Sequence, residues 1–173
     1  MAHRALVAYE RPDGRYDVHT SRWGGLDCRL ARTITGRDPY ASGDVDPVPR
    51  VVARPFDEVL TMVDLARHEA VYRVSAEYEI ETYLPLWFGL AYYVGGVDLD
   101  DRPDGVLVAV ENAADAADLR EWFLAAKDTV AEAVTGGYLD LPTAQSVLAD
   151  ALSQRVEGRT VLEPGQSGGS TER

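Results

Sequence analysis

The alternation of apolar and polar positions at the start of the chain predicts a β-hairpin. Two apolar-rich runs, residues 4–11 and 15–23, flank the turn sequence RPDGR. Proline presets the first central backbone angle of such a turn, and Gly14 can take the left-handed conformation that closes it. With a bulge at Gly14, the strand register places Val7 opposite His19, so that apolar side chains lie on both faces of the hairpin.

The next three segments predict two helices and a loop. Residues 26–35 suit a short helix, and residues 36–50, which are rich in Pro, Gly and Asp, predict a surface loop. An amphipathic stripe predicts a helix from Pro55 to Arg67, with a proline in its first turn and acidic residues near its N-terminus.

Three further strands are predicted in the middle of the chain. The sequence VYRVSAEYEIET, residues 71–82, alternates strictly and predicts one continuous strand with one face in the core and the other in solvent. Residues 86–94 are apolar throughout and suit a buried strand or a short buried helix, and their aromatic content favours the strand. Residues 105–112 predict a further strand.

From Asp115 on, apolar residues recur every three or four positions instead of every second position. This change predicts a long helix closed by two glycines, followed by a second helix over residues 141–156. The fold class expected is therefore α+β: an antiparallel sheet of four or five strands with an N-terminal hairpin, helices over one face and a C-terminal αα-hairpin. A single domain is expected over residues 1–163, with a short edge strand near its end and a flexible tail over residues 164–173.

The charge composition changes the picture of the environment. The 173 residues include 29 acidic and 17 basic side chains, and Lys127 is the only lysine. Such an acid-rich composition is typical of proteins that work in multimolar salt, where the Debye length falls to about 3 Å and self-repulsion is screened. An acidic protein from a GC-rich genome, in which codon bias favours arginine, is the alternative.

Membrane and redox signals are weak. No apolar run reaches the ~20 residues that a membrane-spanning helix needs, and the N-terminus lacks the features of a signal peptide, so the expected location is the cytoplasm. The lone Cys28 excludes an internal disulfide framework, a disulfide-linked partner is not expected, and no metal or cofactor is predicted. Cys28 lies beside two arginines that would lower its pKa, but a small buried core cysteine is the simpler interpretation.

The charge is unevenly distributed along the chain. Residues 1–37 carry seven arginines against four acidic residues, a net charge of +3, whereas the rest of the chain carries a net charge of −15. The candidate partner-binding residues are the arginines and the tryptophan that follow the hairpin: Arg22, Trp23, Arg29 and Arg32. Guanidinium groups beside an aromatic ring suit a protein or RNA partner. The alternative is that these arginines pair with carboxylates of the same chain.

A catalytic site is the competing hypothesis. In the predicted register His3, His19 and Ser21 share one face with Trp23, and a serine beside a histidine permits nucleophilic catalysis. These three residues are the alternative site of a small hydrolase or transferase, with Asp17 available to orient an imidazole. No nucleophile-elbow motif surrounds Ser21, and the plainer interpretation is a polar strand end with hydrogen-bonded histidines.

Three segments resemble a haloarchaeal family of small proteins of unknown function: HRALVAYERPDGRYDVHTSRWG, HEAVYRVS and LWFGLAY. The resemblance extends to about residue 156. It implies a halophilic archaeal cytoplasm and supplies no activity. The leading hypothesis is therefore a soluble, non-enzymatic interaction protein whose Arg- and aromatic-bearing hairpin end and first helix bind a partner. Self-association into a homo-oligomer stays open.

Overall fold

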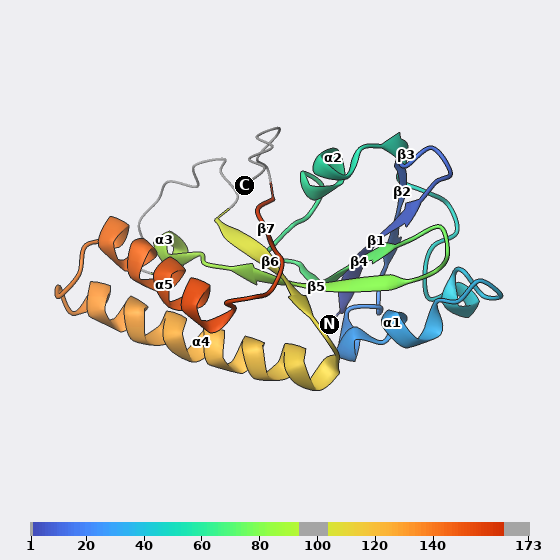
Figure 1. Cartoon of the computed structure of the whole chain (residues 1–173). Coiled ribbons are helices and arrows are strands. Elements are labelled where there is room, and N and C mark those ends of the chain that lie inside the picture. The colour runs from blue at the N-terminus through green and yellow to red at the C-terminus, as the bar shows by residue number, and fades with distance from the viewer. Residues whose placement is uncertain (1, 94–103, 165–173) are drawn as a thin grey trace.

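A single seven-stranded sheet organises the protein in the computed structural model, which describes residues 2–93 and 104–164 (Figure 1). The strand order is β3-β2-β1-β4-β5-β6-β7. The strands are β1 (Arg4–Glu10), β2 (Tyr16–Ser21), β3 (Val51–Arg54), β4 (His68–Val74), β5 (Ile80–Trp87), β6 (Gly105–Val110) and β7 (Val161–Leu162). The mixed α+β class is confirmed, but the sheet has more than the expected four or five strands. The tail predicted from residue 164 lies, from residue 165 on, outside the described residues.

The N-terminal hairpin has the predicted register. Val7 pairs with His19 and Ala5 pairs with Ser21 in the antiparallel β1–β2 ladder. Gly14 takes a left-handed conformation with φ of 79°, and the Arg11 N–H donates to the Arg15 carbonyl at 2.7 Å. The turn residues and the period-two pattern were therefore sufficient to predict this part of the fold.

The sheet is not wholly antiparallel, because β1 pairs in parallel with β4. A parallel pair needs a long crossover connection, and here residues 11–67 supply it and include the strands β2 and β3. The predicted continuous strand over residues 71–82 is wrong. The chain reverses at Ser75–Glu79, where Tyr78 has φ of 63°, and β5 returns beside β4 with Tyr72 opposite Thr82.

The apolar run 86–94 is a strand only at its beginning. β5 ends at Trp87, and the short helix α3 (Leu90–Tyr93) follows. Gly89, with φ of +57°, makes the break between them, and Leu90 is fully buried. The strand interpretation is therefore wrong from Phe88 on, and residue 94 lies outside the part of the chain that the structure describes.

The helices are η1 (Leu26–Cys28), α1 (Leu30–Thr33), η2 (Ala41–Gly43), α2 (Phe56–Leu60), α4 (Ala113–Thr135) and α5 (Leu141–Arg155). The predicted αα-hairpin is confirmed in α4 and α5, whose first turns are capped by the side chains of Asn112 and Asp140. The helix predicted from Pro55 to Arg67 ends at Leu60, because the chain turns at once and the Asp64 N–H donates to His68 Nδ1 instead of continuing a helix.

The helices cover both faces of the sheet, so their expected placement over one face is wrong. α4 and α5 pack on β5 and β6 through Leu84 and Val108, and α1 and η2 pack on the same face of the sheet over Val7 and Tyr72. α2 packs on the opposite face. Within the described residues no helix is both long and apolar enough to cross a bilayer.

Candidate functional site

The candidate site lies where β2 ends and the chain turns into η1 and α1. We define the Arg–Trp surface as Arg22, Trp23, Leu26, Arg29 and Arg32. Trp23 is 43% exposed and Leu26 is 39% exposed, whereas Gly24 and Gly25 between them are buried. The Leu26 N–H donates to the Trp23 carbonyl at 3.2 Å, which keeps the two apolar side chains within one turn of backbone.

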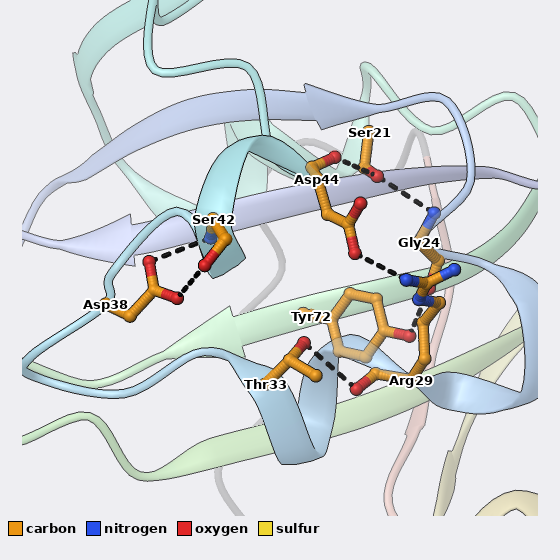
Figure 2. Close-up of polar contacts among 8 residues, drawn as sticks. All are labelled: Ser21, Gly24, Arg29, Thr33, Asp38, Ser42, Asp44 and Tyr72. Atoms are coloured by element: carbon orange, nitrogen blue, oxygen red, sulfur yellow. Dashed lines mark hydrogen bonds and ion pairs between the residues drawn. The ribbon is translucent and has the colours of Figure 1, made fainter.

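Hydrogen bonds on both sides of Gly24 fix the backbone that carries Trp23 (Figure 2). The Gly24 N–H donates to Ser21 Oγ at 2.8 Å, and the Tyr72 hydroxyl donates to the Gly24 carbonyl at 2.6 Å. Burial raises the pKa of Tyr72, so its phenol stays protonated and remains a donor. The Gly25 N–H donates to the His3 carbonyl at 2.8 Å. The loop is thus held to β2, to β4 and to His3, the residue that precedes β1.

The two glycines are required by close packing. A Cβ atom at Gly24 would lie 2.3 Å from Leu30 Cδ1, and a Cβ at Gly25 would lie 2.8 Å from the Arg4 carbonyl oxygen. The neighbour of Gly25 is backbone of the central strand β1, which cannot move aside as a flexible side chain can. Trp23 is therefore followed by two residues that let the chain lie directly on the end of the sheet.

The backbone after the glycines is strained. Asp27 and Cys28 are consecutive non-glycine residues in the left-handed region, with φ of 51° and 49°. Such conformations cost on the order of 1–3 kcal/mol each and collect at binding and catalytic sites. Ala41, Ser42, Ala53 and Tyr78 also have positive φ, so the strain by itself does not distinguish this segment from the turns elsewhere in the fold.

The Trp23 ring has two polar neighbours. The Arg22 guanidinium carbon lies 5.4 Å from the ring centroid, within the range of a cation–π contact. The His3 ring lies 6.1 Å away and is tilted by 46°. His3 Nδ1 in turn lies 2.8 Å from Glu69 Oε2. The ring is therefore positioned by its neighbours although much of it remains exposed.

The arginines of the surface differ in their partners. Arg29 Nη2 donates to Asp44 Oδ2 at 2.7 Å, as the intramolecular alternative expects (Figure 2). Among the residues that the structure describes, no carboxylate pairs with Arg22 or Arg32. Both are exposed, so two of the three arginines remain available to an external group.

The alternative catalytic residues make structural contacts. His19 is 3% exposed, its Nδ1–H donates to the Asp46 carbonyl at 2.8 Å, and its ring contacts those of Tyr9 and Tyr40, which also contact each other. The Ser21 hydroxyl, also buried, donates to the Asp44 carbonyl at 2.6 Å (Figure 2). A hydroxyl has one hydrogen to donate, and here a backbone oxygen receives it.

Asp17 and His3, the other residues of the catalytic hypothesis, also contact groups outside the proposed catalytic set. Asp17 accepts hydrogen bonds from Arg11 and from the Ala53 N–H, and His3 contacts Glu69. Within residues 2–93 and 104–164, no hydrogen bond joins Ser21 to either histidine. Catalysis at His3, His19 and Ser21 stays a prediction, without a nucleophile–base contact to support it.

Cys28 fits the interpretation of a core cysteine. Its side chain is buried against the α4–α5 core. Burial raises the pKa of the thiol, and the charges of Arg120 and Arg32 only partly oppose that effect. A protonated, buried thiol is a poor nucleophile.

Two features of the structure were not predicted from the sequence: a cavity and a buried lysine. A cavity of about 770 Å³ lies between α5 and the strands β6 and β7, with Phe88, Val106 and Leu152 in its wall. Lys127, the only lysine, is 4% exposed and donates to the Trp87 carbonyl at 2.8 Å. It lies four residues after the buried Phe123, so the helical period contained a signal for its burial. None of the predicted site residues lines the cavity.

The fold and the site define an α+β sheet protein with a rigidly held, exposed Arg–Trp surface. The chain belongs to the family of unknown function DUF6735, whose model matches residues 1–46 and 40–162. The expectation of an uncharacterised family is thus confirmed, while its haloarchaeal origin stays a prediction. No curated protein and no solved structure matches the chain.

Proposed function

We propose that this protein is a non-enzymatic interaction protein that binds a protein partner through the Arg–Trp surface. The observation that carries the proposal is an exposed Trp23 on a backbone fixed by three hydrogen bonds. A tryptophan held ready on a rigid segment is what a binding surface requires.

The residue types match those that contribute most to protein interfaces. Tryptophan and arginine are enriched among interface residues whose truncation costs more than about 2 kcal/mol. A fixed loop also loses little conformational freedom on binding, and each side chain left mobile would add about 0.5–1.5 kcal/mol of ordering cost. Trp23 and Leu26 would supply the apolar centre of the interface, and Arg22 and Arg32 its polar rim.

Three observations favour a protein over RNA. The Arg22 guanidinium already lies over the Trp23 ring, which reduces the surface on which a base could stack. Leu26 adds an exposed aliphatic side chain, which suits an apolar pocket rather than a nucleotide. The net charge of −12 repels a polyanion.

We include a halophilic cytoplasm in this proposal. The excess of acidic residues and the near absence of lysine support it. In multimolar salt an interaction that relies on long-range charge is lost, because the Debye length is about 3 Å or less. An apolar contact through Trp23 and Leu26 would persist under those conditions.

The test is affinity co-purification from a halophilic host in about 2 M KCl, with and without nuclease, followed by mass spectrometry and reconstitution with the purified partner. Trp23→Ala is compared with Tyr138→Ala, which removes an aromatic ring that is 86% exposed and lies between α4 and α5. We expect one purified protein to bind the wild type and Tyr138→Ala equally, and Trp23→Ala at least about tenfold more weakly, a loss of roughly 1.4 kcal/mol.

Two outcomes would contradict the proposal. Equal binding by Trp23→Ala and the wild type would remove the Arg–Trp surface from the interaction. Loss of the captured material on nuclease treatment would assign the surface to RNA instead of protein.

A further inference from the structure

We draw no further inference here: the strongest candidate, the cavity of about 770 Å³ between α5 and the strands β6 and β7, carries none because its acidic lining residues Asp104, Glu157 and Glu163 belong to a chain in which acidic side chains outnumber basic ones by 29 to 17, so that they single out no ligand, and nothing in the structure shows what occupies it.

Discussion

Replacing Ser21 with alanine should destabilise the protein by loosening the loop that carries Trp23. The Ser21 hydroxyl accepts from the buried Gly24 N–H at 2.8 Å and donates to the Asp44 carbonyl at 2.6 Å. Without it, the Gly24 N–H has no acceptor, which costs about 1–3 kcal/mol for a buried donor. The Asp44 carbonyl belongs to a half-buried residue and can bind water instead. The loss of its hydrogen bond to Ser21 therefore adds less to the cost in free energy.

We therefore expect Ser21→Ala to lower the free energy of unfolding by about 2–3 kcal/mol. For a chain of this length, that corresponds to a fall in Tm of roughly 5–10 °C. The measurement is urea unfolding followed by circular dichroism at fixed KCl, where the midpoint should fall while the slope stays the same. Affinity for the partner should fall too, because Trp23 would sit on a more mobile loop.

Thr33→Ala is the matched control. The Thr33 hydroxyl donates to the Arg29 carbonyl at 3.2 Å on the exposed side of α1 (Figure 2). Its loss should change the free energy of unfolding by less than about 0.5 kcal/mol. If Ser21→Ala changed stability as little as Thr33→Ala does, the claim that Ser21 holds the Trp23 loop would be refuted.

Three further predictions concern packing, pH and salt. Gly25→Ala should lower Tm more than Ser21→Ala, because the added Cβ would lie 2.8 Å from the Arg4 carbonyl; thermal unfolding that matched the wild type would contradict this. Burial lowers the pKa of His68 below its ordinary value of 6.5, and its Nδ1 accepts the Asp64 N–H. The folded state then binds fewer protons than the unfolded state, so the His68 contribution is complete above pH 6.5 and is lost as the pH falls below it. The free energy of unfolding should decrease less steeply with acidification in His68→Gln, and equal slopes would refute the assignment. Raising KCl from about 0.15 M to 2 M should stabilise the protein, because its net charge of −12 repels itself less as the Debye length shrinks; a free energy of unfolding independent of KCl would exclude this.

Turn residues, hydrophobic periodicity and helix-boundary residues predicted the parts of the fold that are set by residues close together in the sequence. The RPDGR turn and the period-two pattern fixed which residues of β1 and β2 pair, down to Val7 opposite His19. The helices α4 and α5 followed from the change in period and from their glycine and proline boundaries. In each case the deciding contacts lie within a few residues of one another in the sequence.

Features that depend on distant contacts were not predictable in the same way. The alternation of residues 71–82 continues through the Ser75–Glu79 turn, so the pattern could not show that the chain reverses there. The parallel pairing of β1 with β4 joins residues more than sixty positions apart. The strand β3 is short and follows a proline-rich loop, and its pairing with β2 is interrupted by an irregularity.

In the candidate site, too, features set by nearby residues could be predicted and those set by distant contacts could not. Arg22 and Trp23 were recognisable from residue type and position, but the pairing of Arg29 with Asp44 was not, because Asp44 lies in a segment that reads only as a loop. Leu26 was not singled out, since an isolated leucine in a short predicted helix gives no signal of exposure. The left-handed backbone at Asp27 and Cys28 interrupts the helix predicted over residues 26–35, so that α1 begins only at Leu30 and Leu26 stays 39% exposed.

The loop of residues 36–50 links the two hypotheses that the sequence left open. Its backbone carbonyls at Asp44 and Asp46 accept the hydrogen bonds of Ser21 and His19, and its Asp44 carboxylate binds Arg29. The polar side chains that suggested catalysis are thus the ones that attach this loop to the hairpin. His19 and Ser21 thus use their hydrogen-bonding groups within the fold, and Ser21 also accepts from the Gly24 N–H beside Trp23. The exposed side chains of the Arg–Trp surface without such a partner are Arg22, Trp23, Leu26 and Arg32, which is why the protein-binding proposal is built on them.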